Sequence, residues 1–179
     1  MTTHTETIFA LSTAPGRGGI AVIRVSGLNA LTSARSLTAR TSFTPNKIAL
    51  HKITNPVSRE IIDHAMTVYF KTPHSYTGED TIEYHIHGGK AITRELLQTL
   101  SAQPNHRMAE PGEFTRRAFE NGKLDLTEAE AVADLIDAET IQQKNQALSQ
   151  LSGNLSSLYH DWTEPVSYTH LTLPTILLV

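Results

Sequence analysis

Short apolar runs separated by turn residues dominate the first two thirds of the chain. Their spacing predicts strands at residues 7–11, 19–25, 48–53, 65–70 and 81–86, with a turn at 61–64, and helices at 28–37, 92–100 and 113–120. The stretch Ala14-Pro15-Gly16-Arg17-Gly18-Gly19 predicts a tight, irregular loop between the first two strands. Asn121-Gly122 is typical of a helix end. This part of the chain is therefore predicted to be an α+β domain.

Strand-like patterns stop after Leu124, and only helical spacing continues. Thr127 and Glu130 fit a capping box with the Thr127 hydroxyl at the N-cap. Apolar residues then recur near the helical period: Val132, Ile136, Leu148, Leu151, Leu155 and Leu158. We expect the start of a long-helix domain over residues 122–164, after an α+β domain over residues 1–121.

The last segment of the chain, residues 165–179, differs from everything before it. Pro165 is expected to stop the helix, and residues 166–179 contain no Asp, Glu, Lys or Arg. A bare apolar terminus after a charged helix favours aggregation. We therefore hypothesise that residues 165–179 are a non-native junction rather than part of the fold.

Glu83 is a candidate binding residue on the strand at 81–86. The strand alternates, with Ile82, Tyr84 and Ile86 facing one way and Glu83 and His85 the other, as in a half-buried strand. A carboxylate in this place can accept two parallel N–H bonds from a planar heterocycle, in the geometry of a bidentate arginine pair. The alternative is an ordinary solvated strand glutamate.

Arg24 lies near the end of an otherwise apolar strand, on the face that carries Ile20 and Val22. A half-buried guanidinium needs an anionic or carbonyl partner. That partner is either a carboxylate of the fold or a ligand.

A second group of cations comprises Arg116, Arg117 and Lys123. The group has two interpretations: favourable charge at a helix C-terminus, or an anion site where the α+β part meets the helical part.

Composition narrows the class of protein. Hydrophobic residues make up 39% of the 179 residues, enough for a core and too many for a disordered chain. A net charge of -3 argues against a stand-alone nucleic-acid-binding protein. The absence of cysteine excludes disulfides and thiolate metal sites from this stretch. The polar first residues and the lack of a long apolar run predict a soluble cytoplasmic protein without a membrane segment.

Three further motifs do not by themselves predict a site. Gly88-Gly89-Lys90 is not a phosphate loop, because Tyr84 and Ala91 stand where that pattern needs Gly and Ser or Thr. His85 and His87 share a strand face, but no third metal ligand is placed beside them, so no metal site is predicted. The glycines at 16–19 suit either a plain turn or a backbone nest for an anion.

Four blocks of sequence together closely resemble the MnmE (TrmE) family of tRNA uridine-modification GTPases. In order they are residues 13–27 (TAPGRGGIAVIRVSG), 75–80 (SYTGED) running on to His87-Gly88-Gly89, 111–126 (PGEFTRRAFENGKLDL) and 128–138 (EAEAVADLIDA). The blocks occur with fitting gaps, and the resemblance extends over roughly residues 7–158. Four ordered blocks are far more specific than any single motif.

The resemblance implies the following for fold and activity. Members have an N-terminal α+β domain that is similar in fold to folate-dependent aminomethyltransferases, dimerises and binds a tetrahydrofolate derivative, either 5-formyl- or methylene-tetrahydrofolate. A helical domain follows, into which a GTPase domain that uses Mg²⁺ and K⁺ is inserted. With the flavoprotein MnmG (GidA) as partner in a heterotetramer, the family adds a carboxymethylaminomethyl-type group to the wobble uridine of certain tRNAs.

The resemblance also implies folate-contacting residues, which match Arg24, Glu83 and Lys123 here. Glu83 is expected to pair with the amino-pyrimidine edge of the pterin, and Arg24 and Lys123 to hold carbonyl or carboxylate groups. No catalytic residue is expected in this chain, which is interpreted as an N-terminal part without the GTPase domain, so that GTP hydrolysis belongs to the parent protein. The alternative is a self-contained small folate-dependent aminomethyltransferase-like protein.

Overall fold

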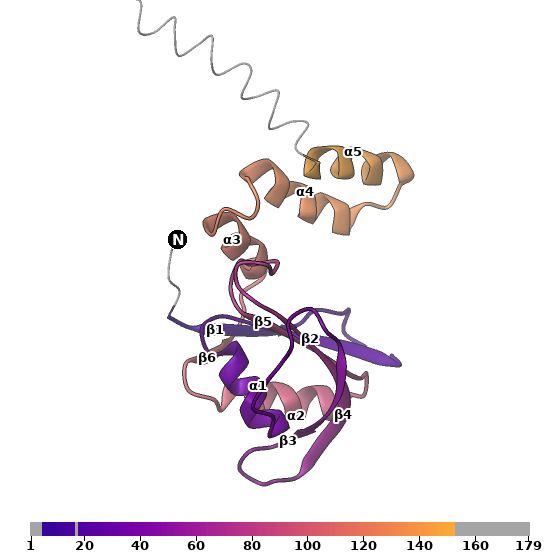
Figure 1. Ribbon diagram of the computed structural model, residues 1–179. Helices are drawn as coiled ribbons and strands as arrows, with labels where there is room; N and C mark the ends of the chain where they lie inside the picture. Colours follow the sequence, from indigo (N-terminus) through magenta and orange to yellow (C-terminus); the bar gives the residue numbers. More distant parts are fainter. Residues whose placement is uncertain (1–4, 17, 153–179) are drawn as a thin grey trace, which may run out of the picture. The chain divides into compact units, whose positions relative to one another are not determined.

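The computed structural model describes residues 5–16 and 18–152. Two compact units divide the chain, Met1–Lys123 and Leu124–Val179. The first is a mixed α/β unit and the second, where described, is helical (Figure 1).

The first unit is built on a six-stranded sheet in the order β3-β4-β5-β2-β1-β6. Its strands are β1 (Thr7–Leu11), β2 (Ile20–Ser26), β3 (Ala49–Thr54), β4 (Ile61–Phe70), β5 (Thr81–His87) and β6 (His106–Met108). Neighbouring strands are antiparallel except β1 and β6, which are parallel. β2 and β5 occupy the middle, so residues on them are the best shielded from the sheet edges.

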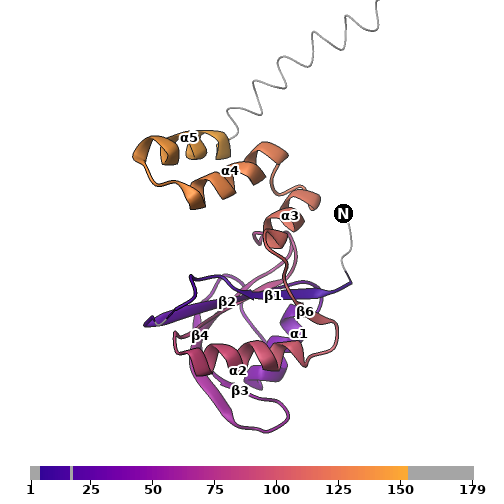
Figure 2. The ribbon, with the colours of Figure 1, turned by 180° about the vertical axis from the view of Figure 1, so that it is seen from behind.

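Two helices, α1 (Ala30–Thr38) and α2 (Lys90–Ser101), cover one face of this sheet (Figures 1 and 2). Their apolar faces join the inward residues of the strands in one buried cluster that includes Ile23, Ile82, Ile86, Leu37 and Leu96. α3 (Glu113–Glu120) lies on the other side of the sheet in both views. Alternation along β2 and β5 therefore sends Ile23 and Ile82 to the helices α1 and α2, and Arg24 and Glu83 to the opposite face.

Two strands differ from the sequence-based expectation. β4 is a strand over its whole length, where residues 61–64 were predicted as a turn, because β3 pairs with it as far as Thr54↔Ile61. β6 was not predicted. Three residues carry too little pattern to be recognised, and β6 is defined by its pairing with β1, for example Ile8↔Arg107.

Gly88 allows two segments to approach closely between β5 and α2. Its N–H donates to Gly19 O, and Gly88 O accepts from the Gly18 N–H, both at 3.4 Å. A Cβ at position 88 would lie 2.4 Å from Gly18 O, so no side chain fits there. The absence of a side chain at Gly88 thus permits this close backbone contact.

A buried ion cluster fixes α3 to the sheet. Arg117 is 1% exposed and donates to Glu113 Oε1 and to both carboxylate oxygens of Glu79, each at 3.2 Å. Arg107 on β6 binds Glu113 with two further bonds of 2.6 and 2.8 Å. The cluster therefore ties α3 to β6 and to the segment that leads into β5.

The end of α3 is a complete Schellman motif. The Lys123 N–H donates to Ala118 O at 2.8 Å, and the Gly122 N–H donates to Phe119 O at 2.9 Å. Gly122 supplies the left-handed residue, with φ +67°. This turn fixes the backbone of Lys123 relative to α3.

The second unit holds two short helices, α4 (Leu126–Asp137) and α5 (Ile141–Leu151), rather than the single long helix that was predicted. The predicted capping box at Thr127 is also wrong: Asp125 is the N-cap residue of α4, and Glu128 is its partner. A second capping box, Thr140 with Gln143, starts α5 and explains the break, because each box satisfies the free N–H groups of a new helix.

Part of the helical prediction lies outside the described residues, namely Leu155, Leu158 and the segment 165–179. Along residues 5–16 and 18–152, no helix combines the length and apolar character needed to cross a membrane.

We predict that Gly88→Ala destabilises the first unit by about 1–3 kcal/mol, because the new methyl group must displace the backbone at Gly18. Gly19→Ala is the matched control, since a Cβ there would meet nothing within 4 Å. Urea unfolding of both variants measures the difference. Equal stability of the two would refute the close-contact argument.

The ion cluster generates a pH-dependent prediction. Burial raises the pKa of Glu113, but hydrogen bonds from Arg107, the Glu110 N–H and Arg117 outweigh burial and lower it to about 2. Because the folded-state pKa lies below the unfolded value of 4.5, the carboxylate stabilises the fold above about pH 4.5. That contribution is lost as the pH falls from 4.5 towards 2.

Glu113→Gln should therefore cost about 3–5 kcal/mol at pH 7, because it leaves two arginines underpaired. The difference in the free energy of unfolding between Glu113→Gln and the unmodified chain should become smaller as the pH falls from 4.5 to 2. Glu110→Gln is the control, since the Glu110 side chain forms an exposed ion pair with Arg116, while its backbone N–H, which binds Glu113, is kept in the variant. Denaturant unfolding at several pH values provides the measurement, and a gap that does not change with pH would contradict the role of the Glu113 carboxylate.

Candidate functional site

Arg24 and Glu83 form an ion pair in the middle of the sheet, on the face opposite α1 and α2. Their Cα atoms are direct partners in the antiparallel pairing of β2 and β5. Arg24 Nε and Nη2 lie 2.9 and 2.8 Å from Glu83 Oε1. The side chains are only 27% and 15% exposed. The partner that a half-buried Arg24 requires is thus a carboxylate of the fold, and Glu83 is not a solvated strand glutamate.

Two aromatic rings flank the Arg24 guanidinium. Its Cζ lies 5.4 Å from the ring centroid of Tyr76 and 5.6 Å from that of Phe114. Tyr76 belongs to the loop between β4 and β5, and Phe114 to α3. The Tyr76 hydroxyl also shares a 2.9 Å hydrogen bond with Thr115 on α3. Loop and helix together enclose the cation, and such contacts favour a guanidinium over the ring faces.

The second carboxylate oxygen of Glu83 remains available as an acceptor. Within the described part of the chain, Oε2 accepts no hydrogen bond; His85 Nε2 lies 3.5 Å away. His85 Nε2 is itself buried and makes no hydrogen bond with the described residues. A planar donor that approached this face would find Oε2 free and Oε1 already shared with Arg24.

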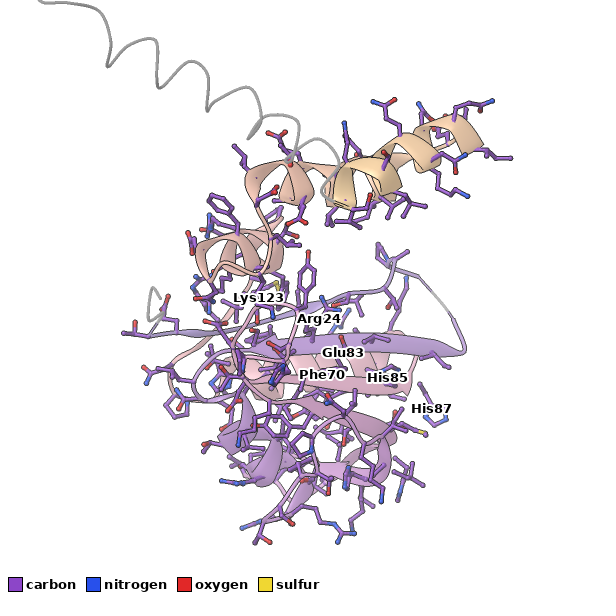
Figure 3. The ribbon with its side chains drawn as sticks, turned by 45° about the horizontal axis from the view of Figure 1, so that its top comes forward. Arg24, Phe70, Glu83, His85, His87 and Lys123 are labelled. Carbon is purple, nitrogen blue, oxygen red and sulfur yellow. The ribbon has the colours of Figure 1, made fainter. Side chains whose placement is uncertain are left out.

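Lys123 completes the set that sequence reasoning singled out. Its side chain packs on the loop between β4 and β5, because a Cβ at Gly78 would lie 3.2 Å from Lys123 Cγ. The same loop carries Tyr76, which contacts Arg24. In Figure 3, Lys123 and Arg24 lie toward one end of the sheet and His87 toward the other. The Lys123 ammonium forms no ion pair with any described residue, so its charge is available to a ligand.

The predicted cationic group at Arg116, Arg117 and Lys123 is divided by the structure. Arg117 is buried among carboxylates, and Arg116 pairs with Glu110 at 3.0 Å. Of these three cations, Lys123 alone forms no ion pair with the residues that the structure describes. A cluster of three cations for an anionic ligand is therefore not what the fold builds, and the reason is the acidic residues Glu79 and Glu113, which neutralise Arg117.

His85 and His87, which share a strand face, have separate environments. His85 points toward Glu83, whereas His87 Nδ1 binds Asp63 Oδ1 at 2.7 Å and the His87 N–H donates to Asp63 Oδ2 at 2.8 Å. Burial raises the pKa of the Asp63 carboxyl, but the hydrogen bonds from His87 outweigh it and lower the pKa. In the described ranges no group of three metal-binding side chains occurs.

Sequence reasoning missed several residues that shape this site. Tyr76 and Phe114 flank Arg24, while Gly78 and Asn121 contact Lys123 or its turn. All four stand inside the blocks that carry the family resemblance, which was the available signal. Their individual jobs depend on contacts between the loop and α3, and spacing along the chain does not reveal those contacts.

A cavity of about 720 Å³ lies elsewhere in the first unit, between the Gly-rich loop and α2. Its lining includes Thr13, Ile20, Lys90 and Arg94, but not Arg24, Glu83 or Lys123. We therefore place the candidate site by its chemistry, the paired and unpaired charges on the sheet face, rather than by cavity volume.

Comparison with protein families gives two matches. Residues 7–123 match the family described as "GTP-binding protein TrmE N-terminus", and residues 126–173 match the "MnmE helical domain". The boundary between the two matches falls where the chain divides into its two units. The second match continues through residue 173 and so includes part of the segment 165–179.

Among curated proteins, this chain is similar to three that bear the name tRNA modification GTPase MnmE. It is 52% identical to the protein of Parvibaculum lavamentivorans over 157 residues, which cover 88% of this chain and 36% of the relative. The values for Rickettsia bellii are 52% over 157 residues, 88% and 35%, and those for Rickettsia canadensis are 52% over 159 residues, 89% and 36%. This chain spans about a third of the length of these relatives.

Proposed function

The chain belongs to the MnmE (TrmE) family, and on this premise we propose that it is the folate-binding part of a tRNA modification GTPase. The proposed ligand is a tetrahydrofolate derivative, 5-formyl- or methylene-tetrahydrofolate, held by Arg24, Glu83 and Lys123. The observation that carries the proposal is Glu83 Oε2 on a largely shielded sheet face, where it accepts no hydrogen bond from the described residues. The same site presents the Lys123 ammonium, which forms no ion pair with them.

The chemistry of these residues fits a folate. The amino-pyrimidine edge of a pterin presents two parallel N–H donors, which suit a carboxylate. Glu83 Oε2 can accept one of them outright, while Oε1 would share its lone pairs between the second donor and Arg24. Arg24 then serves first to orient and neutralise Glu83, and its Nη1 is left for a ligand carbonyl.

The remaining groups suit the other end of the ligand. Folates end in a glutamate, whose carboxylates favour a cation such as the Lys123 ammonium. The rings of Tyr76 and Phe114 border the site and offer apolar surface to an aromatic ligand. When bound, the folate would supply the one-carbon unit, and the residues of this chain would bind and orient it.

The whole protein is proposed to act as the family resemblance implies. It would form a homodimer, associate with an MnmG (GidA)-type flavoprotein and tRNA, and add a carboxymethylaminomethyl-type group to the wobble uridine. GTP, Mg²⁺ and K⁺ would serve a separate GTPase domain, and the protein would work in the cytoplasm. The sheet face opposite α1 and α2 exposes three apolar residues, Ile20, Leu50 and Met66. This exposure supports the proposal that a second copy packs against the first.

We predict that the chain binds 5-formyltetrahydrofolate and that Glu83→Ala raises the dissociation constant about 10- to 100-fold. The reason is the loss of hydrogen bonds to a charged acceptor, which contribute about 1.5–3 kcal/mol. Isothermal titration calorimetry measures the affinity, and circular dichroism checks that each variant is folded.

Two further variants sharpen this test. Lys123→Ala should weaken binding, while Glu60→Ala should not, because Glu60 is an exposed carboxylate in the turn before β4. Absence of binding by the unmodified chain, or equal affinity of Glu83→Ala and Glu60→Ala, would reject the folate site.

We also predict that this chain by itself does not hydrolyse GTP. Its Gly88-Gly89-Lys90 stretch lacks the phosphate-loop pattern, and Gly88 is packed against Gly18, so its backbone cannot cradle a phosphate. Phosphate release from GTP with Mg²⁺ and K⁺ should equal that of a heat-denatured sample. A rate above this background that copurifies with the chain would overturn the prediction.

A further inference from the structure

We infer that Asn121 is a positioning residue, which holds the Lys123 side chain at the proposed folate site by binding the loop against which Lys123 packs. This inference rests on the proposed function of Lys123. It assigns a role in that site to a side chain that touches neither Arg24 nor Glu83 in the structure.

The backbone around Asn121 and Lys123 is fixed by the end of α3. The Schellman motif closes on Asn121 as C-cap and places Lys123 two residues beyond it, through the bond from the Lys123 N–H to Ala118 O. This motif fixes the direction of the chain relative to α3. It does not by itself bring the Lys123 side chain against the loop between β4 and β5.

The Asn121 side chain makes that second connection. Its Nδ2 donates to Thr77 O at 2.8 Å, and this bond clasps the end of α3 to the loop. A Cβ at Gly78, the next residue, would lie 3.1 Å from Asn121 Cβ and 3.2 Å from Lys123 Cγ. Gly78 has φ +78°, so the absence of a side chain and the backbone conformation both favour glycine there. The aliphatic part of the Lys123 side chain thus lies against the backbone at Gly78, and the Asn121 hydrogen bond to Thr77 O holds that backbone next to α3.

The loop between β4 and β5 is in turn hydrogen-bonded to β2, the strand that carries Arg24. Thr77 Oγ1 and Ser26 Oγ share a 2.7 Å hydrogen bond, and Ser26 Oγ donates to Glu79 Oε2 at 2.8 Å. Ser26 lies two residues after Arg24, on the same face of β2. A continuous path therefore runs from Arg24 through Ser26 and Thr77 to Asn121, and then to Lys123.

A double-mutant cycle tests whether Asn121 acts through Lys123. 5-formyltetrahydrofolate is titrated into the full chain and into Asn121→Ala, Lys123→Ala and the double variant. We expect Asn121→Ala to weaken binding about 5- to 10-fold, the effect expected of one lost hydrogen bond. We expect it to cause no further loss when Lys123 is already alanine. Asn29→Ala is the control, because the Asn29 side chain makes no capping bond on α1.

A merely structural role for Asn121 predicts a different result. General damage to the loop would weaken binding equally with and without the Lys123 ammonium, so the two losses would add. Additive losses, or an Asn121→Ala affinity equal to that of Asn29→Ala, would overturn the inference.

A second measurement keeps this inference separate from the folate proposal. Reductive methylation with ¹³C-formaldehyde labels the lysines, and Lys123→Arg assigns the Lys123 signal. In the ligand-free chain, Asn121→Ala should increase the mobility of the Lys123 methyl groups and leave Lys52 and Lys90 unchanged. If the unmodified chain binds no folate but this change occurs, the proposed function fails and the positioning contact stands. If Lys123 mobility is unchanged, the inference fails whatever the folate result.

Discussion

Burial of the Arg117 guanidinium is the constraint on which the first unit depends. A guanidinium removed from water needs anionic partners close by, and Glu79 and Glu113 supply the negative charge. Glu79 comes from the loop before β5, so its pairing with Arg117 joins α3 to that loop, and Arg107 on β6 joins the same cluster through Glu113. A fold that lost this match would lose the placement of α3, and with it the turn that carries Lys123.

The charged groups of the candidate site also differ in whether the fold already pairs them with an opposite charge. Arg117 and Arg116 are neutralised within the fold, Arg24 is paired with Glu83 through one carboxylate oxygen, and Lys123 is not paired with any described residue. A charge already matched contributes to stability and offers little to a ligand, whereas a free ammonium and a free carboxylate oxygen still favour a polar partner. The candidate site therefore consists of the polar groups that are not paired with other described residues. These are one donor, the Lys123 ammonium, and one acceptor, Glu83 Oε2.

Close contacts at two glycines also fix the positions of segments around the site. Gly88 lets β5 and the Gly-rich loop meet, and Gly78 lets the Lys123 stem lie directly on a loop backbone. In both places a methyl group would move one segment away from the other. These glycines belong to blocks that resemble the MnmE family, and the structure gives each of them a separate physical reason.

The sequence by itself determined most of the strands, the helix at 113–120, the family, and the face on which Arg24 and Glu83 lie. These follow from local alternation, from turn chemistry and from the identity of consecutive residues. The break between α4 and α5 follows from a local capping box, Thr140 with Gln143, which the sequence-based prediction missed. Tertiary structure decided β6, the extension of β4 and the burial of Arg117. It also decided that Arg24 pairs with Glu83 and that Asn121 and Gly78 hold Lys123. Each of these depends on contacts between residues far apart in the chain, and such contacts leave no period or spacing in the sequence.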